Sequence, residues 1–239
     1  MSRLSSQGST IVIQDTTGTV QTIKVASATK AKPCVITLAT GTAPIVGTVV
    51  IPRLTGWPSI DNMPFKVSLV AAQVITLEDS DTTSEVATIN STVGTIDKPT
   101  FLELCRANFT ANQPAGATID VTTLCDDAHK IVAGLPAIGT WTAPGFYDCA
   151  DLALQVARDA YRSGAKVALD IRLPDGCGFT FMAIVNTYDV ALGVNVAITN
   201  TVGGQIDGTV HFYKTPPAPG TAFEEFTAPP PPELAQVAA

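Results

Sequence analysis

Strict alternation of apolar and polar residues marks several stretches of the chain and predicts β-strands. The longest is Lys166–Leu173, whose polar face carries Asp170 and Arg172. A Pro-Asp-Gly turn at residues 174–176 follows, and the alternation resumes in Phe179–Val185. Because a tight turn here joins two strands with matching apolar faces, the pattern predicts a β-hairpin.

Shorter runs of the same kind predict a mainly β protein. Ser9–Gln14 and Val20–Val25 flank a turn-like Asp15–Gly18 and predict an N-terminal hairpin over residues 9–26. The many Thr and Val residues favour strands, because β-branched side chains suit a pleated surface better than a helix. Further strands are expected at residues 35–38, 47–51, 65–70, 74–77, 101–109, 117–123, 138–146, 195–201 and 209–213.

One segment, Asp148–Ser163, has the period of an amphipathic helix. We expect Asp148 as its N-cap, because a carboxylate there accepts hydrogen bonds from the first free N–H groups. Gly164 is expected to end the helix. The predicted apolar stripe consists of Ala150, Leu154, Ala157 and Tyr161, widened by Leu152 and Val156.

Breaks in the pattern divide the chain into four parts. Residues 1–32 hold the N-terminal hairpin, and residues 33–88 form a compact inserted unit of short strands. Trp57 and Phe65 are the large side chains of that insert, and for Trp57 we favour core or loop packing over a ligand pocket. Residues 89–215 carry the remaining strands and the helix, and the proline-rich residues 216–239 predict an extended tail.

Composition narrows the possible functions. Hydrophobic residues make up 46% of the 239 residues and suffice for a core, whereas charged residues reach only 15%. The 14 basic and 21 acidic residues give a net charge of −7. Because an acidic chain without runs of Lys and Arg does not neutralise phosphates, binding to nucleic acid is not expected.

The cysteines and the chain start indicate synthesis in a reducing cytoplasm. Polar residues follow Met1 and no run of about 18 apolar residues occurs, so neither a signal peptide nor a membrane span is expected. An odd number of scattered cysteines without a CxxC pair predicts buried free thiols rather than a disulfide framework. The five are Cys34, Cys105, Cys125, Cys149 and Cys177.

Catalytic chemistry has few candidate residues. The only histidines are His129 and His211, and we interpret His211, within an alternating strand, as a packed or surface side chain. Cys125–His129 contains metal-ligand residue types, but its adjacent carboxylates diverge on a helix or a strand, which favours a solvated turn. We therefore expect no catalytic, cofactor-binding or metal site, and a protein that is not an enzyme. Three acids could pair in principle, although nothing in the sequence indicates that they meet: Glu103, Asp120 and Asp170.

The stretch Ala117–Ala128 resembles the segment of siphophage major tail proteins, or tail tube proteins, that leads into their conserved turn. The order that follows is similar too: Gly134–Pro136, a strand to Phe146–Asp148, one helix, and the hairpin around Leu173–Gly176. This likeness covers residues 97–214 and the N-terminal hairpin.

The insert is similar to a small β-barrel module of phage virion proteins. The residues that carry this second likeness are Thr29–Thr37, Gly56–Val67 and Asp81–Glu85. Together the resemblances imply a tail-tube-type β-sandwich or barrel flanked by one α-helix, with a small inserted β-barrel domain. The insert is expected on the outer surface of a tube, because inside it would obstruct the channel.

The resemblance also implies a function. Subunits would form hexameric rings that stack into a tube for DNA ejection, as part of a virion tail assembled in the host cytoplasm. Partners would be the tape measure, tail terminator and distal tail proteins, with no membrane involved. DNA would pass without specific binding through a net negative channel, with the face carrying Asp170 and Arg172 as one candidate wall. The alternative is a β-rich phage adhesin or decoration protein that binds the host surface.

Overall fold

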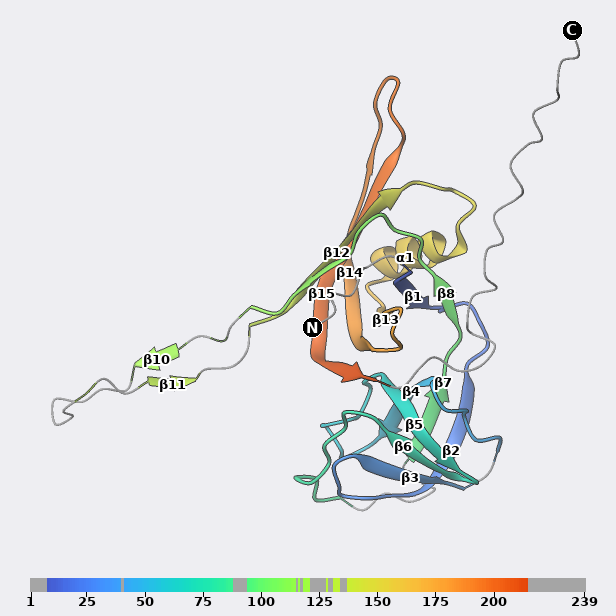
Figure 1. Ribbon diagram of the computed structural model, residues 1–239, viewed down its shortest axis with the longest axis vertical. Helices are drawn as coiled ribbons and strands as arrows, with labels where there is room; N and C mark the ends of the chain where they lie inside the picture. Colours follow the sequence, from blue (N-terminus) through green and yellow to red (C-terminus); the bar gives the residue numbers. More distant parts are fainter. Residues whose placement is uncertain are drawn as a thin grey trace, which may run out of the picture.

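A computed structural model describes residues 8–39, 41–87, 94–114, 116, 118–120, 128, 131–133 and 137–214. Over these residues the protein is mainly β with one α-helix, as the sequence predicts. A seven-stranded antiparallel sheet with the helix on one face forms one body, and a closed six-stranded barrel forms the other (Figure 1).

The sheet places its longest strands at the centre and its shortest at the two edges. Its order is β8-β1-β13-β14-β15-β12-β9. The predicted hairpin at 166–185 is confirmed, because β13 and β14 pair from Lys166–Ile184 to Arg172–Gly178. The strands are β1 (Thr10–Gln14), β8 (Phe101–Glu103), β9 (Thr110–Asn112), β12 (Thr140–Phe146), β13 (Lys166–Arg172), β14 (Gly178–Ala191) and β15 (Thr199–Tyr213).

Helix α1 (Leu152–Ser163) packs on the sheet against β14, β1 and β8. Its N-cap is Asp151, whose carboxylate accepts hydrogen bonds from the N–H groups of Ala153 at 2.9 Å and Leu154 at 3.3 Å. The expected cap, Asp148, instead binds the N–H of Ala150 in the turn before the helix. Gly164 ends the helix in the left-handed conformation, as predicted.

The buried helix face differs from the predicted stripe. Leu154, Val156 and Ala157 are buried as expected, whereas Leu152 and Tyr161 are exposed. The buried face is completed by Ala153 and Ala160. Small side chains at these positions let the helix approach the sheet closely. The helix face that contacts the sheet is therefore rotated about the helix axis from the stripe that the large residues define.

The barrel closes in the order β2-β3-β6-β5-β4-β7. Trp57 and Phe65 are fully buried in its core, and the Trp57 Nε1–H donates to the carbonyl oxygen of Ala87 at 2.9 Å, which confirms core packing for both. The strands are β2 (Gln21–Ala28), β3 (Cys34–Leu38), β4 (Val49–Leu54), β5 (Phe65–Ala71), β6 (Val74–Leu77) and β7 (Gly94–Lys98).

The N-terminal hairpin predicted over residues 9–26 is wrong. Strand β1 pairs with β13 and β8 in the large sheet, whereas β2 pairs with β3 and β7 in the barrel. The turn at Asp15–Gly18 leads from one body to the other, because long-range partners bury the apolar residues of each strand in separate cores. The barrel consequently takes in strands on both sides of the expected 33–88 insert.

The barrel lies within the connection between two neighbouring strands of the sheet. Strands β1 and β8 pair antiparallel up to Gln14 and Phe101, and the N–H of Asp15 donates to the carbonyl oxygen of Thr100 at 2.9 Å. The chain thus leaves the sheet after Asp15 and returns at Thr100, with the whole barrel in between (Figure 1).

Two remaining segments were expected as strands over longer runs. The run predicted at 101–109 forms β8 only to Glu103, and the next strand begins at Thr110. At 117–123 the structure describes β10 (Thr118–Asp120), which pairs with β11 (Ile131–Ala133). Residues 121–127, His129 and the proline-rich 216–239 lie outside the described residues.

Candidate functional site

The polar face of β13 is covered by the barrel. Ala168 and Met182 of the sheet pack against Ile51 of the barrel, and Asp170 between them is fully buried. The sequence places Asp170 and Arg172 on an exposed face that could line a channel, and this prediction is wrong for Asp170. An alternating strand does not reveal whether a second body covers its polar side.

Asp170 is held by three donors from three strands. The Nζ of Lys66, on β5, lies 3.1 Å from its Oδ2, and the Nε of Arg172 lies 2.8 Å from the same oxygen. The hydroxyl of Tyr213, on β15, donates to Oδ1 at 2.6 Å. The Lys66 Nζ also lies 4.3 Å from the centre of the Tyr213 ring, within cation–π range. We call these four residues the junction cluster.

Burial sets the electrostatics of the junction cluster. The side chains of Lys66 and Asp170 are 0% exposed. Burial lowers the pKa of the Lys66 ammonium, and the adjacent Asp170 carboxylate opposes that shift. Burial and the same carboxylate raise the pKa of Tyr213, so its hydroxyl keeps its proton and remains a donor. The arrangement satisfies both carboxylate oxygens, which makes it a joint between barrel and sheet rather than a reactive centre.

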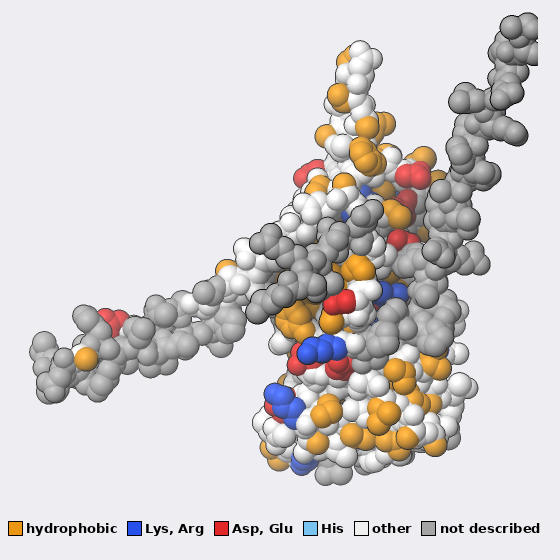
Figure 2. Space-filling model, viewed as in Figure 1, with side chains coloured by type: hydrophobic (Ala, Val, Ile, Leu, Met, Phe, Trp, Pro, Cys, Tyr) orange, Lys and Arg blue, Asp and Glu red, His pale blue; other side chains and the backbone are white. Residues whose placement is uncertain are grey.

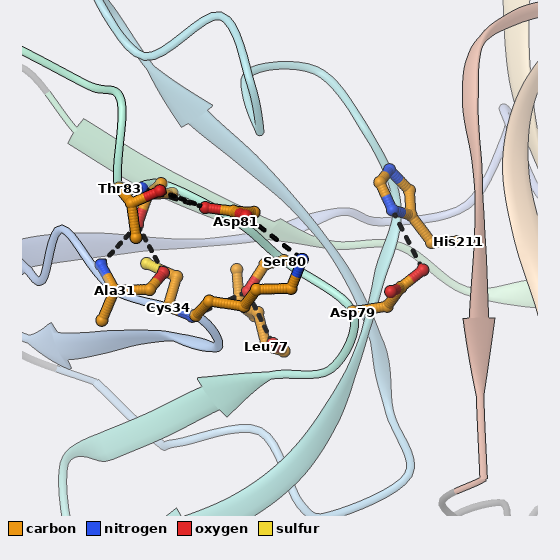
Figure 3. A network of polar contacts seen from close by, with 10 residues as sticks. Ala31, Cys34, Leu77, Asp79, Ser80, Asp81, Thr83 and His211 are labelled. Atoms are coloured by element: carbon orange, nitrogen blue, oxygen red, sulfur yellow. Dashed lines mark hydrogen bonds and ion pairs between the residues drawn. The ribbon is translucent and has the colours of Figure 1, made fainter.

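A second set of contacts joins the turn after β6 to the end of β15. The Asp79 carboxylate accepts from the N–H of Phe212 at 3.0 Å and lies 3.8 Å from the Nδ1 of His211 (Figure 3). The carboxylate of Glu78 accepts from the N–H of Lys214 at 2.8 Å. These bonds fix the last strand of the sheet against the barrel.

His211 is a packed residue, the first of the packed and surface positions that the sequence leaves open. It is buried, with its ring 4.1 Å from the ring of Phe65 between centres. Burial lowers its pKa, and the nearby Asp79 opposes the shift only in part. The imidazole is therefore neutral at pH 7.

The loop that carries Asp79 is itself anchored to the barrel. The hydroxyl of Ser80 accepts from the N–H of Cys34 at 2.8 Å and donates to the carbonyl oxygen of Leu77 at 2.6 Å. Figure 3 shows this buried network beside the Asp79–His211 contact. The anchoring holds Asp79 in position and so supports the contact with β15.

A cavity of about 570 Å³ lies beside β8 and the start of α1. Its lining contains the acids Glu103, Asp148 and Asp151 around the buried side chain of Arg106. The Nη2 of Arg106 lies 3.9 Å from the Asp151 carboxylate, and burial lowers the pKa of the guanidinium. With three acids around one base, the lining does not favour an anionic ligand.

The three acids that could pair do not meet. Asp170 belongs to the junction cluster, Glu103 lines the cavity beside β8, and Asp120 lies on β10. Among the described residues no group of three or more His, Cys, Asp and Glu could hold a metal ion. The segment Cys125–Asp127 and His129 lie outside the described residues.

The cysteines differ in burial. Cys34 is buried, and burial raises the pKa of its thiol. Cys105 and Cys149 are exposed and Cys177 is half-buried, so the expectation of buried thiols is wrong for these three. All four are free. No helix in the described part of the chain is long and apolar enough to cross a membrane.

The β14–β15 hairpin projects beyond the rest of the sheet (Figure 1). Neighbour β13 pairs with β14 only as far as Ile184, so β14 extends beyond it to Ala191, whereas β12 pairs with β15 from its first residue, Thr199. The loop between the two strands extends further still and carries apolar side chains along its length (Figure 2). Both sheet edges are short, because β8 and β9 have three residues each.

Sequence reasoning missed most residues of the barrel–sheet joint. The sequence singles out Asp170, Arg172 and His211 but not Lys66, Tyr213, Glu78 or Asp79. Lys66 stands between the apolar Phe65 and Val67 in a predicted strand, where a charged residue is typical of a solvent-facing side, so the local pattern does not indicate its burial. Its partner lies 104 residues away and could not be identified from local pattern.

Comparison with known proteins finds likenesses among solved structures. No family model and no curated protein matches the chain. One solved structure, described as the virion of a native gene transfer agent particle, shares 18% identity over 45% of this chain and 84% of its own, with a TM-score of 0.39. A second, the tail of an empty gene transfer agent particle with C6 symmetry, shares 17% identity over 48% and 87%, with a TM-score of 0.41.

Proposed function

We propose that this protein is a structural subunit of a bacteriophage tail tube. The observation that carries the proposal is the open seven-stranded sheet, whose edge strands β8 and β9 have no outer strand partner among the described residues. Unpaired edges are templates for joining neighbouring copies, and closing a ring occupies all of them. The resemblance of residues 97–214 to tail tube proteins supports a hexameric ring stacked into a tube.

The wall that we assign to the channel is the part of the helix-free face, on β12 and β15, that the barrel leaves open. The barrel packs on the same face of the sheet beside Asp170, so this assignment puts it at one end of the wall and not on the outer surface expected from the sequence. Thr140, Thr142 and Gln205 are exposed on that face and uncharged. Nearby, Lys166 and Asp207 form an ion pair at 2.7 Å, which cancels their charges. A wall with few free bases lets DNA pass without the phosphate contacts that cause binding. The face of β12 and β15 replaces the face around Asp170 as the proposed channel wall, because Asp170 is buried.

The remaining parts of the proposal follow from a role in a tail. The protein acts by assembly and is not an enzyme, and it binds no cofactor. In the virion it contacts further copies of itself and the tape measure, tail terminator and distal tail proteins. It assembles in the host cytoplasm without a membrane.

Analytical ultracentrifugation of the purified chain tests the ring. We expect a species at six times the 24.8-kDa chain mass, together with larger multiples of it. Assembled material should retain no DNA at physiological salt. A protein that stays monomeric at every concentration contradicts the proposal, and monomers that bind host cells would favour the adhesin or decoration alternative.

A further inference from the structure

The loop end of the β14–β15 hairpin is densely apolar and exposed. We call residues 190–198 the hairpin tip; Leu192 there is 76% exposed and Val194 is 90% exposed. The segment contains no charged residue. Exposed apolar groups this closely spaced mark an interaction site rather than ordinary surface. Five large apolar side chains are exposed in the tip: Val190, Leu192, Val194, Val196 and Ile198.

The opposite end of the same two strands carries an apolar pocket. This base pocket, of about 510 Å³, lies where β14 begins and β15 ends, with walls that include Leu173, Phe179 and Phe212. Phe212 is 61% exposed. The acids at its margin are already engaged, because Glu78 and Asp79 accept backbone hydrogen bonds from the end of β15. The base Lys214 also lines the pocket. The floor formed by Leu173, Phe179 and Phe212 is apolar and fits an uncharged partner.

The hairpin tip cannot occupy its own base pocket. The 14 residues of β14 separate the two features by about 45 Å at a rise of about 3.3 Å per residue. The strands are paired along their length and cannot fold back. A hairpin tip that fills the pocket therefore belongs to another copy.

We propose that the hairpin tip of one copy docks into the base pocket of the next copy, so that copies join head to tail. This inference rests on the proposed function and identifies the contact that stacks one ring on another. A tip and a pocket on different surfaces of each copy make a heterologous contact, which extends copy by copy into an open stack when its rotation does not close a ring. The contact between tip and pocket is independent of ring closure. The sheet edges run along β8 and β9, whereas the tip and the pocket lie at the ends of β14 and β15.

A single cysteine in the tip tests the contact, because the base pocket already contains the free, half-buried Cys177. The variant is Val194→Cys in a background with Cys105, Cys125 and Cys149 changed to serine. Diamide then oxidises two adjacent thiols to one disulfide and takes up the two hydrogens. We expect a ladder of covalent dimers, trimers and longer chains on non-reducing gels. Adding Cys177→Ser should abolish the ladder.

The other outcomes overturn the inference in distinguishable ways. Rings without a ladder would leave the proposed function standing and remove the stacking contact. A ladder that persists with Cys177→Ser would place the contact elsewhere, and one that stops at dimers would indicate a symmetric tip-to-tip contact. Absence of any assembly in the unmodified protein would overturn the proposed function and the inference together.

A charge in the tip provides a second readout. Val194→Asp should reduce the ratio of stacked to single rings at least about tenfold, because an unpaired carboxylate in an apolar pocket costs more than the 1.4 kcal/mol that a tenfold change requires. Val86→Asp is the matched control, since Val86 is 87% exposed on the barrel side of the molecule. Equal stacking in the two variants would contradict the proposal.

Discussion

Asp170 is the residue at which barrel and sheet meet, and its surroundings explain why it can remain there. Three donors from three strands satisfy its two oxygens, and two of them carry positive charge. A buried ion pair adds little net stability compared with apolar packing, but removing one member leaves an uncompensated charge. We therefore interpret the junction cluster as the set of contacts that fixes the orientation of the barrel on the sheet.

Removing the acid should cost more than removing the lysine. Asp170→Asn leaves the buried Lys66 without its counter-charge, so we expect a loss of about 3–5 kcal/mol in the free energy of unfolding. Lys66→Met should cost clearly less, because Arg172 and Tyr213 still satisfy the carboxylate. Urea denaturation of the two variants measures the difference. Equal losses would show that Arg172 and Tyr213 do not support Asp170 as the distances indicate.

His211 should make the fold sensitive to mild acid. Its pKa in the folded state lies below the unfolded value of 6.5, because burial disfavours the charged ring. Above pH 6.5 the His211 imidazole is neutral in both the folded and the unfolded protein. Below pH 6.5 the imidazole of the unfolded chain binds a proton that the folded protein does not bind. The free energy of unfolding therefore falls as the pH drops from 6.5 towards the folded pKa.

Denaturation at pH 7.5 and 5.5 checks this sensitivity. His211→Phe keeps a ring beside Phe65 and should lose less stability on acidification than the parent does. The same change at His129, the other histidine, is the control. If His211→Phe and the parent lose the same amount, another group causes the acid sensitivity.

At the scale of elements, helix α1 illustrates what local pattern can and cannot predict. The existence of the helix, its end at Gly164 and the burial of Leu154 follow from sequence period and capping chemistry. The N-cap was misplaced by three residues because Asp148 and Asp151 are both plausible caps. Leu152 was misassigned because only the approach direction of the sheet decides which helix face is buried.

The strands show the same division. The hairpin of β13 and β14 was predictable from a turn and matching alternation. The pairing of β1 with β8, and of β2 with β7, joins residues far apart in sequence and leaves no local signal. The candidate site was the least predictable part, because the residues that bury Asp170 belong to the barrel.

Matched leucine changes test the orientation of the helix. Leu154 is 1% exposed and Leu152 is 61% exposed, two residues apart on the same helix. Leu154→Asp should destabilise the fold by at least about 3 kcal/mol, because even Leu→Ala in a core costs about 2–5 kcal/mol. Leu152→Asp should change stability by less than about 0.5 kcal/mol. Comparable melting temperatures for the two variants would show that the helix is rotated.

At the scale of the whole molecule, the barrel is an insertion between paired strands. Asp15 and Thr100 are hydrogen-bonded neighbours, so the sheet and helix can be connected without the barrel. The barrel supplies Lys66 to the junction cluster and two acids to the base pocket, but no strand to the sheet. The proposed ring closure by the sheet edges should therefore not depend on the barrel.

Removing the barrel should separate ring formation from stacking. Replacing residues 16–99 with Asn-Gly, a pair suited to a two-residue hairpin turn, joins Asp15 to Thr100. We expect a folded protein that forms rings by sedimentation, with fewer stacks because Glu78 and Asp79 are missing from the base pocket. Adding Met182→Thr controls for the apolar surface that the deletion uncovers. A folded but monomeric deletion variant would show that the barrel makes ring contacts.

Electron microscopy of the negatively stained, unmodified protein tests the tube most directly. The open sheet, its short edges and the projecting hairpin predict rings of six copies with a central hole, stacked into tubes of uniform width. Class averages of end-on views should show sixfold symmetry. Fields of single monomers at high protein concentration, or fibres without a central channel, would contradict a tail tube subunit.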